Sequence, residues 1–547
     1  MSRADIRFRR LLDRGFYPQE LPPTFRTKNF GTSGSALLAI NGLNSGYSGS
    51  TIFLDGSNFQ GNHRTFGVIN PVNYCLLSRH IADEWSEIAK FMRKSRSSLF
   101  QLKFPNSISE GGRSFEKVTF SSKLKHQQYL SSSYPVVLCL DINRFYGSIY
   151  THSIPWAALG KAQAKARLSG PRQPQHWSEK LDRLAQYCND RQTIGIPIGP
   201  DTSRIISEVI LTGIDTDLTK SGSGISTTQF VHSIDDYEFG ITYNNQLDII
   251  SVKFERSIRQ FELRSNEYKK RVEDGRTAGM ELWQHRFDYV SKLEGNSFIE
   301  ALFSLIWEEK KRTPDANVVG YALRRFRKKI AHQLDRGQVL RHLQRLAFAA
   351  PHLISWIAPF FVGFKAGDDL DSAQKRLIRW SASESARRHD IVTLLWFLYL
   401  HLHFDLRIEM QLFRDCFDID NPLVDLVLSH AKHNNLVQGA FSHMVSRYDS
   451  VKLNSASWIF LYEVERKSWN HSYKNGKIGT SYDDFGAYDT LRNGNVEFYD
   501  PSQFGLLSFN TDLTDADFDG HWRHEHEQRD HDWSDYDEDD EDWGGYI

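Results

Sequence analysis

The chain has 547 residues, of which 40% are hydrophobic and 25% are charged, and its formal net charge is −1. These proportions are typical of a soluble protein with ample apolar core, divided among roughly three to four domains. No run approaches the ~20 apolar residues that span a bilayer, and residues 1–14 lack the apolar centre of a secretory signal, so we expect a cytoplasmic protein without a membrane partner.

The charge is distributed unevenly along the chain. Residues 511–547 contain fifteen Asp or Glu and two Arg, a balance of −13, so the other 510 residues together carry +12. A basic body predicts a polyanionic partner such as nucleic acid, and an acidic tail, which we expect to be disordered, would compete for the same surface. The four cysteines are far apart and form no CxxC pair, which argues against a zinc site or a disulfide framework.

The first 125 residues are predicted to mix short helices, strands and loops. Residues 31–61 are rich in Gly, Ser and Asn, which indicates loops and short strands, and a helix is expected from Val72 to Arg93. Arg64 and Arg113 are candidates to grip an incoming triphosphate or a template backbone. A solvated surface arginine is the stronger alternative for either residue taken alone.

Two later stretches place carboxylates at the ends of predicted strands. The apolar run Pro135–Leu140 leads straight into Asp141, as in a buried strand that delivers an acid at its end. Asp235 and Asp236, 94 residues further on, separate two strand-like runs and predict a hairpin with acids at its tip. Neighbouring carboxylates repel one another unless a cation lies between them, and their hard oxygens suit Mg²⁺. Solvated acids at two unrelated strand ends are the alternative.

The segment between these two stretches is predicted to hold a ligand-approaching turn. Residues 167–180 indicate a loop, and a helix is expected from Ser178 to Asn189. The glycines and prolines of residues 192–204 would let the backbone approach a base pair or its phosphates closely. Asp201, Thr202 or Ser203 would cap the helix that continues through to Leu218.

Taken in order, these segments resemble the motifs of a reverse transcriptase. Residues 141–149 resemble motif A, 195–203 motif B, 233–236 motif C and 263–269 motif D. The string Ile149-Tyr-Thr-His-Ser-Ile-Pro-Trp156 is similar to one carried by bacterial abortive-infection (Abi) and other defence-associated, "unknown group" reverse transcriptases. The resemblance covers residues 15–275 and implies an α+β fold with the fingers and palm of a right-hand polymerase.

The resemblance also implies roles for individual residues. Metal-contacting residues would be Asp141, Ile142, Asp235 and Asp236, with Mg²⁺ as cofactor, and Lys269 would donate a proton to the leaving pyrophosphate. The nucleotide-binding residues would be Arg64, Phe145, Tyr146, Pro197, Gly199 and Ser203, with the Tyr146 ring as the steric gate that favours dNTPs over rNTPs. Ser233 and Ile198 depart from the family pattern, which puts ordinary primer handling and fidelity in question.

The second half of the chain is predicted to be helical. Apolar residues recur at spacings of three and four, which indicates helices over 298–309, 316–334, 339–361, 373–384, 389–403 and 422–433. Abi-type relatives carry a HEAT-like repeat domain after the polymerase, and the helices here fit such a stack. We therefore predict fingers in 1–125, palm in 126–290, an α-helical repeat domain in 291–510 and a tail in 511–547.

Several polar clusters in this half have competing interpretations. The five cations within Arg324–Lys329 fit either a nucleic-acid groove or a solvated helix face. His401 and His403 share no face of a helix, and the histidines of the tail are more simply solvated than metal-bound.

Two classes of function remain open on the sequence. The first is an RNA-directed or template-independent DNA polymerase in antiphage defence, acting on dNTPs with a non-coding RNA as a candidate template and DNA as product. The second is a non-catalytic nucleic-acid-binding protein of the same fold. Family relatives also suggest a homo-oligomer and DNA synthesis primed on a tyrosine, with Tyr546 as candidate and Tyr536, Tyr17 and Tyr47 as alternatives.

Overall fold

The computed structural model describes residues 1–43, 46–57, 61–99, 102–108, 113–115, 128–169, 175–275, 283–314, 316–333, 335–364, 370–438, 444, 447–448, 451–469 and 485–502. Its N-terminal part contains α1 (Arg3–Arg14), α2 (Phe30–Leu38), α3 (Pro71–Asp83) and α4 (Trp85–Met92). Strands β1 (Ile52–Ser57) and β2 (His63–Val68) form an antiparallel hairpin. The single helix predicted for residues 72–93 is therefore wrong, because the chain breaks it at Glu84.

Helix α2 replaces part of the loop region expected over residues 31–61. Its two glycines serve close packing, because a Cβ on Gly31 would collide with the Asp13 carboxylate and one on Gly34 with Leu12. The Gly31 amide donates to the Asp13 carboxylate at 2.6 Å. This segment is helical because it packs tightly on α1, and its composition alone does not favour a helix.

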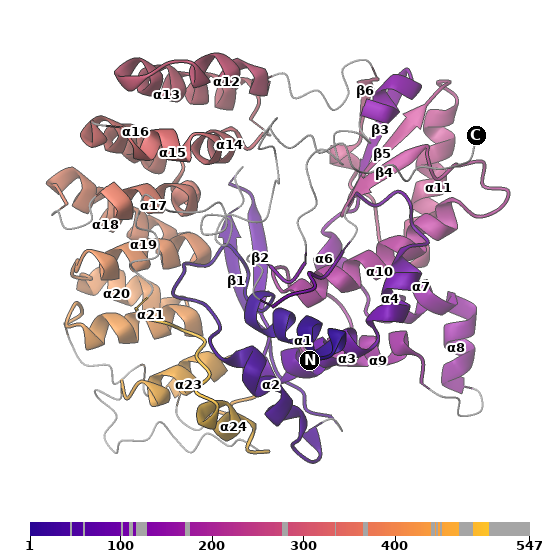
Figure 1. The fold of residues 1–547 in the computed structure, drawn as a ribbon, viewed down its shortest axis with the longest axis horizontal. Helices are drawn as coiled ribbons and strands as arrows, with labels where there is room; N and C mark the ends of the chain where they lie inside the picture. Colours follow the sequence, from indigo (N-terminus) through magenta and orange to yellow (C-terminus); the bar gives the residue numbers. More distant parts are fainter. Residues whose placement is uncertain are drawn as a thin grey trace.

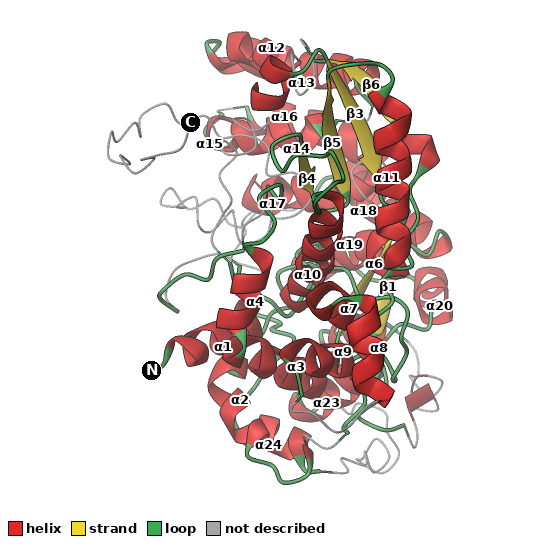
Figure 2. Ribbon diagram, turned by 90° about the vertical axis from the view of Figure 1, so that its right-hand side faces the viewer, coloured by secondary structure: helices red, strands yellow, loops and turns green. Residues whose placement is uncertain are grey.

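A four-stranded antiparallel sheet lies at the other side of the molecule. It consists of β3 (Val136–Asp141), β4 (Phe230–Ser233), β5 (Asp236–Ile241) and β6 (Arg271–Asp274) in the order β4-β5-β3-β6. Helices α10 (Asp201–Leu218) and α11 (Gln246–Gln260) pack near it, as Figure 2 shows. The Phe254 ring of α11 lies 5.0 Å from the Tyr237 ring of β5, and α10 bonds to the same tyrosine through Asp215. The predicted strand at Asp141 and the predicted hairpin at Asp235 are thus confirmed.

Four shorter helices connect β3 to α10, and a short turn precedes β6. They are α6 (Phe145–Ser148), α7 (Ser153–Leu159), α8 (Lys161–Ser169), α9 (Trp177–Tyr187) and the 3-10 helix η2 (Glu267–Lys269). The cap expected from Asp201, Thr202 or Ser203 is wrong, because α10 begins after Pro200 without a side-chain cap. The Asp201 carboxylate instead accepts hydrogen bonds from Arg113 and from the Ser114 amide.

Helices of the second half form a stack beside the sheet-containing half (Figure 1). They are α12 (Trp283–Ser291), α13 (Gly295–Arg312), α14 (Val318–Arg325), α15 (Arg327–Ala331), α16 (Arg336–Ala349), η3 (Pro351–Leu353), α17 (Ile354–Phe364), α18 (Ser372–Arg387), α19 (Ile391–His403), α20 (Met410–Asp418) and α21 (Pro422–His433). The helices predicted for 316–334 and 339–361 are each two helices, broken at Phe326 and at Ala350-Pro351. Helix α20 was not predicted.

The cations of Arg324–Lys329 contribute to packing within this stack. The Arg325 guanidinium donates to the Asp288 carboxylate at 2.5 Å and to the Tyr321 hydroxyl at 2.6 Å. The Lys329 ammonium bonds to the Glu294 carboxylate at 2.7 Å. Arg325 and Lys329 therefore tie α14 and α15 to the preceding helices α12 and α13, which neither of the two sequence interpretations anticipated.

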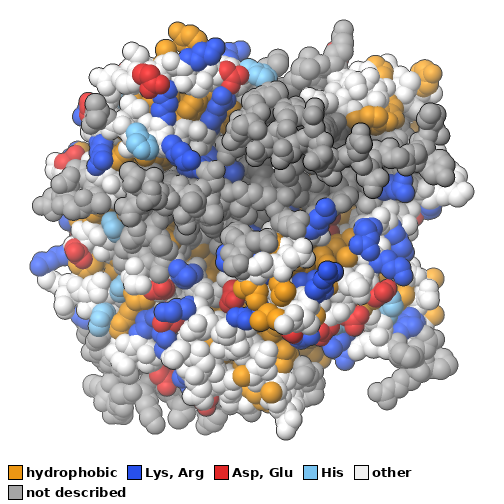
Figure 3. All heavy atoms as spheres, in the orientation of Figure 1, with side chains coloured by type: hydrophobic (Ala, Val, Ile, Leu, Met, Phe, Trp, Pro, Cys, Tyr) orange, Lys and Arg blue, Asp and Glu red, His pale blue; other side chains and the backbone are white. Residues whose placement is uncertain are grey.

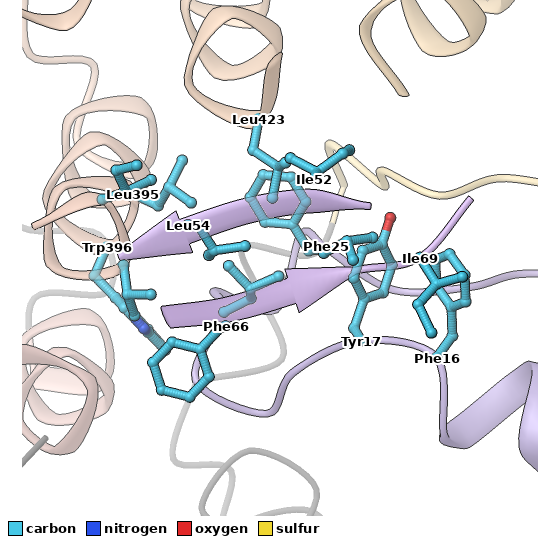
Figure 4. Close-up of a cluster of buried hydrophobic side chains, with 14 of the residues drawn as sticks. Phe16, Tyr17, Phe25, Ile52, Leu54, Phe66, Ile69, Leu395, Trp396 and Leu423 are labelled. Carbon is cyan, nitrogen blue, oxygen red and sulfur yellow. The ribbon is translucent and has the colours of Figure 1, made fainter. Parts of the chain in front are cut away.

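The β1–β2 hairpin joins the two halves of the molecule through one continuous apolar core. Figure 4 shows Leu54 and Phe66 of the hairpin among side chains from α19, α21 and residues 16–25. The indole nitrogen of Trp396 in α19 donates to the Glu20 carbonyl at 2.7 Å. Because this core is shared, the helical stack and the N-terminal segment are fixed relative to each other.

The end of the described chain folds back onto its beginning. Helices α23 (Trp458–Arg466) and α24 (Ala487–Asn493) lie against the N-terminal region, where α24 packs on α2. The Tyr17 hydroxyl donates to the Phe498 carbonyl at 2.8 Å, and the backbones of Lys28 and Glu497 pair. Residues 495–499 thereby close the core formed by residues 8–30.

The observed mixture of helices with small antiparallel sheets is consistent with the predicted α+β class. The finer assignments, a right-hand polymerase and a HEAT-like repeat, stay predictions. Among the described residues, no helix is both long and apolar enough to cross a membrane.

Candidate active site

Two paired strands bring the three predicted aspartates together. Strand β3 ends at Asp141, which lies directly opposite Asp236, the first residue of β5, in the antiparallel register. Residues in such positions have Cβ atoms about 4.5–5.5 Å apart, so like charges there repel. Asp235 occupies the turn just before β5, and its carbonyl accepts a hydrogen bond of 3.1 Å from the Ile142 amide. The three carboxylates therefore share one end of the sheet.

The turn that carries Asp235 has a strained backbone. Ile234 adopts a φ of 57°, a left-handed conformation that a β-branched residue rarely takes. Such a residue costs of order 1–3 kcal/mol and persists where its surroundings impose the conformation. Two hydrogen bonds impose it. His232 Nδ1 donates to the Ile234 carbonyl at 3.2 Å, and the Ile142 amide donates to the Asp235 carbonyl. Strain of this kind is concentrated at functional sites.

A buried polar network anchors the turn from below. The Asp215 carboxylate of α10 accepts hydrogen bonds from His232 Nε2 at 2.9 Å, from the Tyr237 hydroxyl at 3.0 Å and from the Ser95 hydroxyl. Burial lowers the pKa of His232, but the Asp215 and Glu208 charges outweigh this effect and raise its pKa overall. Both imidazole nitrogens donate to oxygens, which fits a charged ring. His232 was not singled out from the sequence. Its position directly after the apolar residues Phe230 and Val231 of a predicted strand is the signal that could have indicated a buried polar role.

Lys269 completes the cluster from a segment that docks on the end of β3. The Asn266 amide donates to the Asp141 carbonyl at 2.8 Å, which positions η2 beside the carboxylates. The Lys269 ammonium then bonds to the Asp141 carboxylate at 2.8 Å. Burial lowers the pKa of Lys269, but the bond and charge of Asp141, with the charges of Asp236 and Asp235, raise it overall. The predicted catalytic lysine and the predicted catalytic aspartate are thus in direct contact.

The electrostatics of the cluster favour a cation. Burial, followed by the charges of Asp236 and Asp141, raises the pKa of Asp235 to about 7. Three carboxylates face one ammonium, so the site keeps an excess of negative charge. Among the described residues, no three His, Cys, Asp or Glu side chains are close enough to enclose a metal ion as they stand. The donor chemistry nonetheless fits Mg²⁺, because a divalent cation would relieve the repulsion among the carboxylates, which adds to burial in raising the pKa of Asp235.

The predicted nucleotide-binding residues lie on three neighbouring segments. Tyr146 is half-buried, and its hydroxyl lies 3.3 Å from the Ser207 hydroxyl of α10. Burial raises the pKa of Tyr146 to about 12, so its hydroxyl stays neutral. Phe145 and Ser203 are each only 2% exposed, so they pack beneath the surface of the site and are not open to a ligand in this conformation.

The glycine- and proline-rich segment is held against β2, the strand that carries Arg64. Gly67 of β2 donates its amide to the Ile198 carbonyl at 2.9 Å, and a Cβ on Gly67 would collide with Pro197. Gly199 has a φ of 118° and lies too close to Pro18 for any larger side chain. Arg64 is half-buried on the same strand. This segment is therefore fixed by packing, and its predicted close approach to a ligand stays a prediction.

The structure gives Arg113 a different role from the predicted one. Its guanidinium bonds to the Asp201 carboxylate at 2.7 Å and to the carbonyls of Tyr17 and Gly199, each at 2.6 Å. Only 11% of its side chain is exposed. Arg113 therefore joins the N-terminal segment to the start of α10 and is not placed to grip a triphosphate.

Two of the alternative priming tyrosines are excluded by burial. Tyr17 and Tyr47 are each 7% exposed, and the Tyr17 hydroxyl is bonded to the Phe498 carbonyl. Tyr546 and Tyr536 lie outside the described residues. His401, weighed as a metal ligand on the sequence, is buried in α19, where its Nδ1 lies 2.8 Å from the Phe397 carbonyl.

Comparison of the chain with protein-family models gives no match, and comparison with curated proteins likewise gives none. The functional argument therefore depends on the geometry described above and on the sequence motifs.

Proposed function

We propose that the chain is a DNA polymerase of the reverse-transcriptase type that acts in antiphage defence. The observation that carries the proposal is the convergence of Asp141, Asp235 and Asp236 at one end of an antiparallel sheet, with the Lys269 ammonium beside them. The strained turn, anchored by the buried ion pair of His232 and Asp215, keeps Asp235 in place. An arrangement that concentrates negative charge at a cost in stability is expected at a catalytic centre.

The reaction transfers a nucleotide to a growing end. A terminal hydroxyl attacks the α-phosphorus of a dNTP, a new P–O bond forms, and the bond to the pyrophosphate breaks. Mg²⁺ held by Asp141, Asp235 and Asp236 would supply the positive charge that stabilises the phosphates in such a displacement. Lys269 is protonated and 57% exposed at its side chain, so its ammonium can turn from Asp141 to give the departing pyrophosphate a proton.

Tyr146 provides the selection of sugar in this proposal. Its ring centroid lies 5.6 Å from that of the buried Phe145, and its hydroxyl lies 3.3 Å from the Ser207 hydroxyl of α10. These two contacts restrict the orientation of the ring, as a steric gate against a ribose 2′-hydroxyl requires.

The template and the biological setting rest on the resemblance. RNA, with a non-coding RNA as candidate, would be the template, and DNA the product. In the string Ile149–Trp156, which carries the resemblance to defence enzymes, the half-buried Tyr150 ring packs on those of His152 and Trp156. A homo-oligomer through the helical stack is proposed on the same resemblance.

Incorporation of labelled dNTPs by the purified chain tests the proposal. With Mg²⁺ and an RNA template, or with no template, wild-type protein should incorporate label and the isosteric Asp235→Asn variant should not. Asp248→Asn removes an exposed carboxylate from α11 in the same half of the molecule and should leave the rate unchanged. Normal synthesis by Asp235→Asn would contradict the site. Binding of nucleic acid without synthesis by wild-type protein would favour the non-catalytic alternative.

A further inference from the structure

The helical stack carries exposed aromatic rings on its outer layer. Helices α13, α16, α18 and α20 lie one above another at the left of Figure 1, away from the sheet that holds the carboxylates. Phe348 of α16 is 41% exposed and Trp380 of α18 is 44% exposed. Their ring centroids are 5.6 Å apart, so the two rings form one apolar platform that bridges α16 and α18. Contiguous exposed apolar surface can mark an interaction site, whereas apolar residues exposed singly are normal.

Arginines flank this platform along both helices. Arg341 and Arg345 precede Phe348 by seven and three residues, and Arg376 precedes Trp380 by four, so each cation shares a helix face with a ring. All three arginines are exposed. Arg345 lies over the Trp307 ring of α13 at 5.4 Å, which continues the alternation of cation and ring to a third helix. Among the described residues, Arg341 and Arg376 have no ion-pair partner.

We propose that this outer face, defined by Arg341, Arg345, Phe348, Arg376 and Trp380, binds single-stranded nucleic acid. Stacked bases on exposed rings and phosphates on arginines are the two contacts by which proteins hold single strands. A duplex would use only the cations, because its bases are already stacked and their faces are hidden. The face lies away from the carboxylates, so it forms a second site that does not depend on the catalytic assignment.

The charge of the face argues against pairing with a second copy through the same surface. A two-fold interface places a patch against itself, so the unpaired arginines would meet like charges. Acidic groups nearby are partly neutralised within the protein, as at Glu384, which bonds to Arg388 at 2.6 Å. Figure 3 shows Lys and Arg side chains over both halves of the molecule, with Asp and Glu among them, so general basicity alone does not single out this face. The feature that distinguishes this face is the pair of exposed rings, Phe348 and Trp380.

Binding of fluorescent twelve-residue oligo(U) and oligo(dT) to the full chain in EDTA tests the platform. The double variant Phe348→Ala/Trp380→Ala should weaken binding about tenfold to a hundredfold, since each stacked base contributes on that scale. Phe348→Tyr/Trp380→Phe keeps both rings and should retain wild-type affinity. Tyr243→Ala removes an aromatic ring that is 68% exposed in the other half of the molecule and serves as the matched control. A stronger preference for either oligonucleotide supports the proposal and identifies the sugar that the face selects.

The salt dependence of binding tests the arginines separately. Arg341→Gln/Arg376→Gln should reduce the slope of log K against log salt by about 1.4, from roughly 0.7 per phosphate contact on a single strand. Arg256→Gln, an exposed arginine of α11, is the matched control. The same losses should occur in Asp235→Asn protein, which separates this site from the catalytic one.

Three results would overturn the proposal. The first is undiminished affinity of the ring-deleted variant for single strands. The second is an equal loss for a duplex of the same length, which would mean that stacking is not the contact. The third is a change in sedimenting mass without a change in oligonucleotide affinity, which would make the face an interface between copies of the chain.

Discussion

Replacing Asp235 by Asn should stabilise the metal-free protein while destroying its activity. Burial and the neighbouring carboxylates raise the pKa of Asp235 from 3.8 to about 7. Its ionised form is therefore disfavoured in the folded state relative to the unfolded chain. The penalty is absent below pH 4, grows as the pH rises from about 4 to 7, and is complete above pH 7. At about 1.4 kcal/mol per pKa unit, a rise of about three units amounts to roughly 4 kcal/mol.

Thermal denaturation in EDTA at pH 4.5 and at pH 8 measures this difference. For a chain of 547 residues that unfolds as one unit, Asp235→Asn should melt about 2–4 °C above wild type at pH 8 and close to it at pH 4.5. Adding Mg²⁺ should raise the melting temperature of wild type more than that of the variant, because the cation neutralises the charge that the variant lacks. Asp248→Asn, on an exposed turn of α11, should show neither effect.

Two results would refute this reasoning. Equal or lower stability of Asp235→Asn at pH 8 would mean that burial and the neighbouring carboxylates do not disfavour the ionised form of Asp235. A gain in stability that is the same at both pH values would mean that the effect is unrelated to ionisation.

The remaining predictions concern selectivity, packing, assembly and priming. Tyr146→Ala should raise rNTP use relative to dNTP in a competition assay, whereas Tyr146→Phe keeps the ring and should not; unchanged discrimination in the alanine variant would remove the gate. Arg113→Ala should destabilise the fold by about 3–5 kcal/mol in thermal denaturation, because it leaves the buried Asp201 carboxylate without its cation, and a loss below about 1 kcal/mol would contradict that role. Native mass measurement should give a multiple of the 63.3 kDa subunit, and a single subunit with and without RNA would count against assembly. If synthesis is primed on the protein, protease digestion after labelling should yield a nucleotide on Tyr546, and covalent DNA that persists in Tyr546→Phe would exclude that residue.

The strand that ends at Asp141 and the hairpin at Asp235 could be predicted because their signals are local. An unbroken apolar run followed by an acid specifies a buried strand and its end whatever surrounds it. The contact between Lys269 and Asp141 joins residues 128 positions apart, and no local pattern contains it. The sequence indicated both partners through their motifs but not that they touch.

The failed predictions come from residues whose conformation is decided by distant partners. Residues 30–38 have a loop-like composition, yet they form a helix because their glycines let α1 approach closely. Arg113 resembles any surface arginine until the fold places Asp201 beside it. The break at Ala350 is an exception, since Pro351 marks it in the sequence and the long apolar pattern concealed that signal.

The closure of the N-terminal core by residues 495–499 has a consequence for how the protein is made. The Tyr17 hydroxyl and its partner carbonyl on Phe498 are 481 residues apart. At about 5–20 residues per second, a ribosome needs roughly 25–100 s to supply the second partner after the first. During that interval Phe16 and Phe30, whose rings pack on Phe498 in the finished protein, lack that cover. Nascent chains should therefore engage chaperones through this segment, and release should follow translation of residue 498 rather than completion of the sheet.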